Sequence, residues 1–272
     1  MVSQEQRKRQ LAREKFLRQQ QRRTSARRKA RMRNSVIASV LGVIVIGSVA
    51  LYTTGVLKND DKANASADVT PSASPTSKAP DPCEKADKGS VEKLSWKNEP
   101  AVTIDKSAKY TMKLATTCGD IGIAMKTSAA PHTVNSFNFL AGKGFFDHTK
   151  CHRLTTNGIY VLQCGDPTGT GSGGPGYTIP DENLKDASLK SNVYPAGTVA
   201  MANTGQKHTG GSQFFLVYQD SQLPPSYTPF GTIDAAGMKV LKKIAAAGEN
   251  TGAGDGAPNA TVVINKATVT KS

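Results

Sequence analysis

Two stretches carry the most information in this chain: residues 151–182, CHRLTTNGIYVLQCGDPTGTGSGGPGYTIPDE, and residues 198–218, TVAMANTGQKHTGGSQFFLVY. The first places one arginine, Arg153, near the start of an apolar β-hairpin and continues into a glycine-rich loop. The second contains two short runs in which polar residues precede aromatic ones. Both stretches are therefore expected to contribute strands to a sheet.

The sequence on either side extends this β pattern and adds two helices. Alternating apolar and polar residues indicate strands, Pro131 is favourable at the start of a helix, and Asp234 is a good N-cap for a second. Many short strands with two helices are typical of a closed barrel capped at its ends. The predicted elements are strands at 110–116 and 121–126, a helix from Pro131 to about Gly142, strands at 151–155, 159–164, 198–202, 213–218 and 228–233, a helix after Asp234 that ends at Gly248, and a closing strand at 260–269.

In order and spacing, these features resemble the active face of cyclophilin-type peptidyl-prolyl isomerases, over about residues 110–269. The resemblance implies a mainly β fold, a closed antiparallel eight-stranded barrel capped by two helices. It also implies an enzyme that isomerises X–Pro bonds without a cofactor or a metal. Arg153 matches the catalytic arginine of the family's Phe-His-Arg motif, although Cys151 stands at the first position.

The resemblance also implies the residues that would bind the substrate. Alternation along the strands agrees with it, because Val161 and Gln163 share one face of their strand and Gln213 and Phe215 share one face of theirs. The implied set consists of Tyr160, Val161, Phe215 and Leu223 around the proline ring, Gln163 and Gln213 as amides beside Arg153, Ala202 and Asn203 along the extended peptide, and Tyr227 where the family often carries His or Tyr.

Three positions depart from the family pattern. The turn at 155–159 is longer than usual, and Val161 replaces the usual methionine in the pocket. Gln222 stands where eukaryotic members often carry tryptophan. The last difference predicts weaker binding of cyclosporin without loss of isomerase activity.

An arginine suits this chemistry because rotation about an X–Pro bond is opposed by amide resonance, with a barrier of about 18–20 kcal/mol. Twisting the bond gives the prolyl nitrogen a lone pair, and a fixed donor aimed at it stabilises the twisted state more than the planar one. Arginine stays charged and presents its N–H groups in a rigid fork. The alternative is a proline-peptide binding module or holdase, but a pure binder would not need a cation at this nitrogen.

Three weaker patterns point to other activities and are not favoured. Residues 169–174 match GxGxxG, yet Pro175, Gly176 and Pro180 follow where a dinucleotide fold needs a helix. His148 and His152 have a metal-binding spacing only if they lie on a helix, and a strand is predicted there. Ser212 lacks the glycine that a nucleophile elbow needs two residues later, where Phe214 stands.

The region before the barrel divides into three parts. Residues 1–33 hold 13 Lys/Arg and two Asp/Glu, so most of the formal charge of +14 lies in this tail. Residues 36–57 are uncharged and long enough to cross a bilayer. The predicted organisation is a basic cytoplasmic tail at 1–35, a transmembrane helix at 36–57, a Pro/Ser/Ala-rich linker at 58–100 and an isomerase domain at 101–272.

This organisation predicts a single-pass protein of the cell membrane with its C-terminal domain outside the cytoplasm. A cleaved signal peptide remains the alternative, because Ala63, Ala65 and Ala67 could form a cleavage site. The expected partners are X–Pro segments of unfolded or exported proteins, with anionic lipid at the basic tail; the tail lacks the interleaved aromatic residues that would favour nucleic acid. All four cysteines fall on the outer side, and at least one disulfide is expected, its pairing left open.

Overall fold

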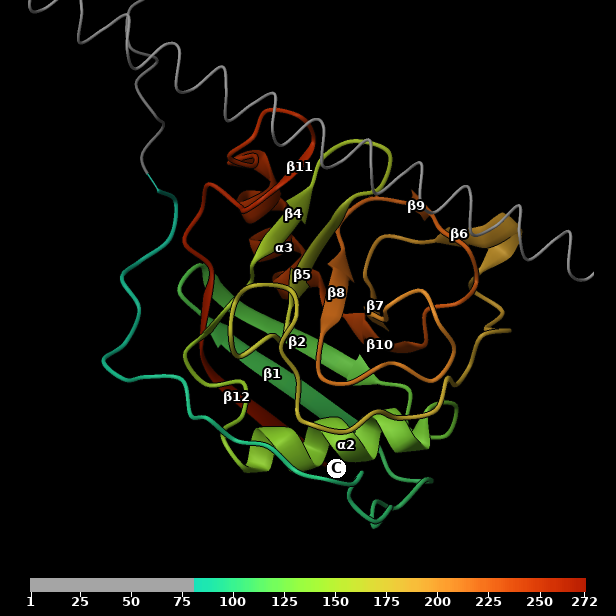
Figure 1. Cartoon of the computed structure of the whole chain (residues 1–272). Helices are drawn as coiled ribbons and strands as arrows, with labels where there is room; N and C mark the ends of the chain where they lie inside the picture. The colour runs from blue at the N-terminus through green and yellow to red at the C-terminus, as the bar shows by residue number, and fades with distance from the viewer. Residues whose placement is uncertain (1–80) are drawn as a thin grey trace, which may run out of the picture. The chain divides into compact units, whose positions relative to one another are not determined.

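The structure is a computed structural model that describes residues 81–272. Its main feature is a curled sheet of ten strands, in which every pairing is antiparallel and the order is β11-β4-β5-β8-β7-β10-β2-β1-β12-β3 (Figure 1). The strands are β1 Tyr110–Thr116, β2 Gly119–Met125, β3 Thr149–Lys150, β4 Arg153–Thr155, β5 Val161–Cys164, β7 Thr198–Met201, β8 Phe214–Val217, β10 Pro229–Ile233, β11 Asp255–Gly256 and β12 Val263–Lys271. A separate ribbon pairs β6 Val193–Tyr194 with β9 Ser221–Gln222, after a 3-10 turn at Lys190–Asn192.

The mainly β class with two helices is confirmed, whereas the predicted closed barrel of eight strands differs from the observed sheet. One stretch, 149–155, is divided between two neighbours: β3 pairs with β12, and β4 pairs with β5. The change of partner falls at Cys151, whose N–H bonds to Val262, and His152, whose N–H bonds to Gln163. This change of partner within one stretch of chain curls the sheet. Among the described strands, β11 and β3 are the two edges of the curled sheet.

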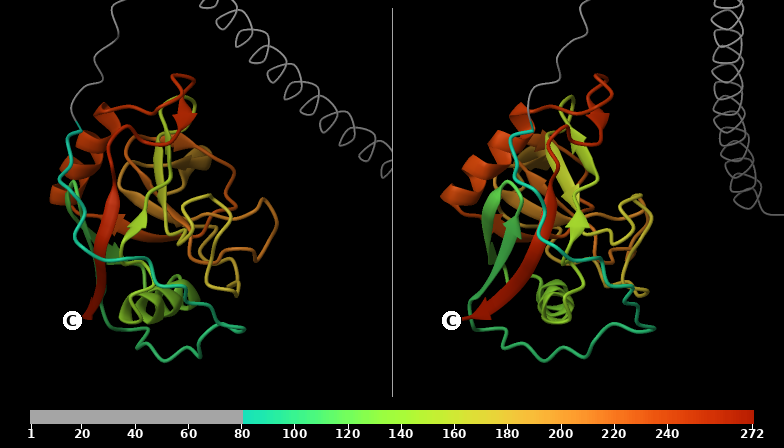
Figure 2. Two further views of the ribbon diagram at one scale, coloured as in Figure 1. Left: turned by 60° about the vertical axis from the view of Figure 1, so that its left-hand side comes forward. Right: turned by 90° about the vertical axis from the view of Figure 1, so that its left-hand side faces the viewer.

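Two helices cover opposite ends of this sheet (Figure 2), and both begin where the sequence predicts and end within two residues of the predicted glycine. Helix α2, Pro131–Gly142, has proline in its first turn and packs on β12. Its N-terminus is capped from a distance by the Glu182 carboxylate, which accepts backbone N–H groups of His132 and Thr133 at 3.0 and 2.9 Å. Helix α3, Ala235–Ala246, packs on β2, and its N-cap Asp234 accepts from the Gly237 N–H at 2.6 Å.

Strands β5, β7 and β8 are buried on both faces, so each face contributes to a different apolar cluster. Leu162, Phe214 and Leu216 point into the main core, which also holds the rings of the α2 helix and its neighbours. Alternation turns the residues between them to the other face. There a second apolar cluster forms from Val161, Tyr194, Ala200, Phe215 and Val217.

The segment before β1 is attached to the domain. Cys83 forms a disulfide with Cys118, and the Trp96 N–H bonds to the Pro175 carbonyl at 2.8 Å. The indole of Trp96 packs edge-on against Phe139, with ring centroids 5.0 Å apart. The predicted linker at 58–100 includes these residues, so the packed part of the chain begins well before the predicted boundary at residue 101.

The predicted transmembrane segment at 36–57 lies outside the described residues. Among the helices at 81–272, none combines the length and the hydrophobicity that a bilayer crossing requires. The predictions for the basic tail and for the first part of the linker likewise fall outside the described range.

Candidate active site

The second apolar cluster forms the floor of a small cavity of about 170 Å³. Aromatic and aliphatic side chains line one side of it, and an arginine and two amides line the other. The lining residues are Arg153, Ile159, Val161, Gln163, Ala202, Asn203, Phe215, Leu223 and Tyr227. Most of the site residues implied by the resemblance are therefore brought together in one place.

Strand register explains why these residues meet. Arg153 on β4 lies opposite Gln163 on β5, which lies opposite Phe215 on β8, which lies opposite Ala200 on β7. Directly opposed residues in an antiparallel sheet project from the same face. A single row across four strands thus presents, in order, a cation, an amide, an aromatic ring and a methyl group.

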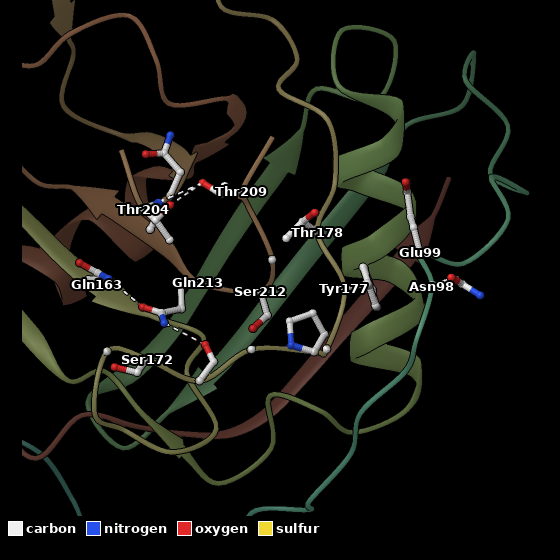
Figure 3. A pocket seen from close by; sticks show the side chains of 18 of the residues that line it. Asn98, Glu99, Gln163, Ser172, Tyr177, Thr178, Thr204, Thr209, Ser212 and Gln213 are labelled. Atoms are coloured by element: carbon white, nitrogen blue, oxygen red, sulfur yellow. Dashed lines mark hydrogen bonds between the residues drawn. The ribbon is translucent and has the colours of Figure 1, made fainter. Parts of the chain in front are cut away.

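The polar side of the cavity is a chain of hydrogen bonds that starts at the guanidinium. Nη1 of Arg153 donates to Oε1 of Gln163 at 3.2 Å. Nε2 of Gln163 donates to Oε1 of Gln213 at 2.9 Å (Figure 3). Nε2 of Gln213 then donates to the Gly173 carbonyl at 2.9 Å. Both amides are thereby fixed in orientation, with their oxygens turned toward the donor that precedes them.

Arg153 has a second partner that the sequence did not indicate. Nε and Nη2 donate to the two carboxylate oxygens of Asp255, each at 2.7 Å. The hydrogen bonds to Asp255 raise the pKa of Arg153, and they lower the pKa of Asp255, so the pair is fully ionised at neutral pH. The two residues are 102 positions apart, and Asp255 lies on the short strand β11 in a glycine-rich stretch, so no local signal could have found it.

The apolar side of the cavity is held from beneath by a buried tyrosine. The rings of Phe215 and Tyr227 meet edge-on at 5.5 Å. The hydroxyl of Tyr194 donates to the Tyr227 carbonyl at 2.8 Å and accepts from the Tyr227 N–H at 3.2 Å. Burial raises the pKa of Tyr194 to about 12, so the hydroxyl stays neutral at physiological pH and keeps both hydrogen bonds to Tyr227. Tyr194 is a further supporting residue that sequence reasoning missed.

Two predicted site residues lie elsewhere. Tyr160 does not line the small cavity: its ring packs on Tyr218 at 5.8 Å, because neighbours along a strand point to opposite faces and Val161 occupies the cavity side. Ile159, at the end of the lengthened turn, lines the cavity instead. Gln213 contacts the cavity indirectly, through its bond to Gln163.

Asn203 lines the cavity, but its side chain is engaged within its own loop. Its Nδ2 donates to the Ser226 carbonyl at 2.8 Å, and its Oδ1 accepts from the Gly205 N–H at 2.9 Å. The N–H of Ala202 bonds to the Gln213 carbonyl at 2.9 Å. The predicted side-chain contact from Asn203 to a peptide is therefore not prearranged, and the polar groups of its main chain are the better candidates.

A larger cavity of about 990 Å³, seen in Figure 3, shares a wall with the small one. The two share Gln163, Ala202 and Asn203 as a common wall. The glycine-rich loop and the segment 97–99 form the far side of the larger cavity. Together the cavities make a continuous groove in which a small apolar ring and the chain that carries it can lie side by side.

The glycine-rich loop is a structural turn. It folds around the buried carboxylate of Asp166, which accepts backbone N–H groups of Thr168, Thr170 and Gly171 at 2.7, 3.1 and 2.6 Å. Residues 175–189, directly after the loop, form no helix, as the sequence predicted. The loop therefore presents carbonyl groups such as that of Gly173 to the groove.

The site combines a small apolar cavity with an oriented cation at its rim. None of the described residues that line this cavity is a serine, cysteine or histidine. Such a site fits a proline ring whose peptide continues along the groove.

Comparison with known proteins agrees with a site that binds a proline ring. Residues 111–269 match the family model for cyclophilin-type peptidyl-prolyl cis-trans isomerases. A probable peptidyl-prolyl cis-trans isomerase B of Mycobacterium leprae is 52% identical over 165 residues, which cover 58% of this chain and 56% of the relative. A peptidyl-prolyl cis-trans isomerase of Helicobacter pylori is 39% identical over 141 residues, covering 51% of this chain and 81% of that protein.

A solved structure gives the same result. The crystal structure of a cyclophilin-type peptidyl-prolyl cis-trans isomerase from Cryptosporidium parvum superposes with a TM-score of 0.50 at 26% identity, over 60% of this chain and 99% of that one. The chain belongs to the cyclophilin-type peptidyl-prolyl cis-trans isomerase family, as the sequence predicted. It spans about half the length of the mycobacterial relatives that it matches.

Proposed function

We propose that this protein is a peptidyl-prolyl cis-trans isomerase in which Arg153 stabilises the twisted X–Pro amide. The observation that carries the proposal is the position of Arg153 at the rim of a proline-sized apolar cavity, hydrogen-bonded to Gln163 and Asp255. An arginine has five N–H groups, and three are engaged here. The two others have no partner among the described residues and can donate to a substrate.

The proposed mechanism requires no covalent step. The proline ring rests on Phe215 and Val161, and the peptide on either side follows the groove past Ala202. As the X–Pro bond twists, the prolyl nitrogen loses resonance and gains a lone pair, to which a free N–H of Arg153 donates. Because this bond forms in the twisted state and not in the planar one, it lowers the barrier selectively.

The experiment replaces Arg153 and measures turnover. Arg153→Ala is expected to lower kcat/KM by on the order of 10²-fold on a prolyl peptide, the scale for loss of one preorganised donor. Protease-coupled or NMR exchange assays on a peptide of the type Ala-X-Pro-Phe would measure it. Lys113→Ala is the matched control, because Lys113 is an exposed cation of β1 with its own 2.7 Å ion pair to Asp120. Normal turnover in the Arg153 variant would remove this residue from its proposed role.

The second candidate is a proline-peptide binding module or holdase with incidental turnover. The apolar cavity alone would serve it, and peptide affinity should then depend on Phe215 and not on Arg153. Measuring turnover and peptide binding together in the Arg153→Ala variant separates the two. An isomerase loses turnover while it retains most of its affinity, whereas the incidental turnover of a binding module would not depend on Arg153.

We further propose that the domain works outside the cytoplasm, held at the membrane by residues 36–57. The support is the uncharged 22-residue run preceded by the basic tail. Exported chains that arrive unfolded contain X–Pro bonds whose uncatalysed isomerisation takes tens to hundreds of seconds, slow enough to limit folding. Such chains are the proposed substrates, and anionic lipid is the proposed contact of the tail.

A further inference from the structure

We propose that Asp255 is a positioning residue for the isomerase reaction, which holds the guanidinium of Arg153 in the orientation that donates to the prolyl nitrogen. This inference rests on the proposed function and adds to it a residue that lies outside the small cavity, on a different part of the chain. The argument has three parts: the contact, the rigidity of the loop that carries Asp255, and the lack of another restraint on Arg153.

The contact is bidentate and leaves one N–H on each of Nη1 and Nη2 without a partner among the described residues. Asp255 takes the Nε and Nη2 hydrogens at 2.7 Å each, along one side of the planar guanidinium. Strand pairing explains the reach: Asp255 on β11 lies opposite Thr155 on β4, and Thr155 shares a face with Arg153 two residues away. A two-point contact with a planar group fixes both its position and its tilt.

The loop that carries Asp255 is itself fixed. Glu249 accepts the N–H of Gly254 at 2.9 Å, and the Gly254 carbonyl accepts the N–H of Thr156 at 2.9 Å. Gly254 has a φ of +90°, and a Cβ there would lie 2.5 Å from the Cβ of Asn157, so only glycine allows the loop to approach β4 this closely. The loop thus presents the carboxylate as part of a rigid frame.

Without Asp255, little would hold the arginine. Its side chain is 38% exposed, and its other hydrogen bond in the described structure is the 3.2 Å contact with Gln163. An ion pair this exposed contributes little to folding stability, since Asp255 is itself 54% exposed. The value of the pair therefore lies in orientation, because the long arginine side chain would otherwise sample many rotamers.

The test compares Asp255→Ala and Asp255→Asn with Asp120→Ala and Asp120→Asn in the full-length chain. Asp120 is the matched control: it is 59% exposed, forms a 2.7 Å ion pair with Lys113, and lies on β2 away from both cavities. We expect Asp255→Ala to lower kcat about tenfold with KM changed less than twofold, because misaligned donors cost rate rather than ground-state binding. Asp255→Asn, which keeps one acceptor oxygen, should fall between Asp255→Ala and wild type. The Asp120 variants should match wild type.

Two further measurements separate positioning from a general structural effect. In an Arg153→Ala background, Asp255→Ala should change kcat/KM less than twofold, since there is no guanidinium left to orient. The Nε–H resonance of Arg153 should be protected from solvent exchange in wild type and lose that protection in Asp255→Ala. Thermal melts of all variants should agree within a few degrees.

The outcomes are distinct. Equal turnover in the Asp255 and Asp120 variants, a gain in kcat/KM on removing Asp255, or an undiminished effect in the Arg153→Ala background would overturn the inference and leave the proposed function standing. Wild-type chain without turnover would overturn both.

Discussion

At the residue scale, Gln222 stands at the position where eukaryotic family members often carry tryptophan. It is exposed on β9, and the next residue, Leu223, lines the cavity. A tryptophan here would add a large apolar surface and an N–H donor for a bound ligand. We expect Gln222→Trp to tighten cyclosporin binding by roughly tenfold or more, since burial contributes about 25 cal/mol per Å². Titration calorimetry would measure it.

Gln219→Trp is the control for that substitution, because Gln219 is also exposed and neither of its sequence neighbours lines either cavity, whereas Leu223 beside Gln222 does. Isomerase turnover should stay within a few fold in both variants, since neither ring reaches Arg153. If cyclosporin binds the Gln222→Trp protein no better than wild type, another feature controls access, and the lengthened turn at 155–159 becomes the leading candidate.

The same scale shows what the sequence could and could not reveal about the site. Val161, Gln163 and Phe215 were implied by the family resemblance, and strand alternation agrees with the faces that they occupy. Alternation also explains why Tyr160 lies elsewhere: a residue adjacent to Val161 on an extended strand points away from the cavity. Asp255 and Tyr194 reach the site through tertiary contacts that no local pattern encodes.

At the scale of elements, the second disulfide is expected to stabilise the β4–β5 hairpin. Cys151 and Cys164 are bonded across a separation of 13 residues that includes Arg153 and the lengthened turn. In the chain-entropy account a loop of this size contributes about 3 kcal/mol to stability. Replacing both cysteines with alanine should therefore lower the free energy of unfolding by roughly 2–3 kcal/mol, as measured by urea denaturation.

Wild-type protein in reducing buffer is the comparison for the double variant. Reduction also breaks the Cys83–Cys118 disulfide, so the contribution of that bond is measured with the corresponding double alanine variant. After that contribution to the free energy of unfolding is subtracted, the reduced wild type and the Cys151/Cys164 variant should be equally stable. A double variant as stable as the oxidised wild type would show that the hairpin is held by its ladder and packing alone.

The helices were predictable from local signals, since Asp234 caps α3 through its own side chain and Pro131 begins α2. The way the sheet curls was not. It depends on the stretch 149–155 changing partners between β12 and β5, and pairing between residues more than a hundred positions apart leaves no mark in a single sequence.

At the scale of the whole molecule, composition placed the boundary between the linker and the isomerase domain too late, at residue 101. A Pro/Ser/Ala-rich run reads as a spacer, yet Cys83 and Trp96 attach its last part to the domain through a disulfide and aromatic packing. Two residues with strong tertiary contacts outweigh a polar local composition. The segment also lines the larger cavity through residues 97–99, so it contributes to the candidate groove.

The last prediction concerns how the chain meets the membrane. Residues 36–57 carry no charge, and the basic tail precedes them. The positive-inside rule therefore predicts a cytoplasmic tail and an outer C-terminal domain. Full-length protein should fractionate with membranes, and protease added to intact cells should digest the domain. Val45→Arg, at mid-span, should reduce insertion, because a charge there costs about 2.5–3.5 kcal/mol, whereas Asn59→Arg beyond the span should not. A soluble species that begins near Ala65–Asp68 would instead identify the segment as a cleaved signal peptide, and the domain would then act free of the membrane.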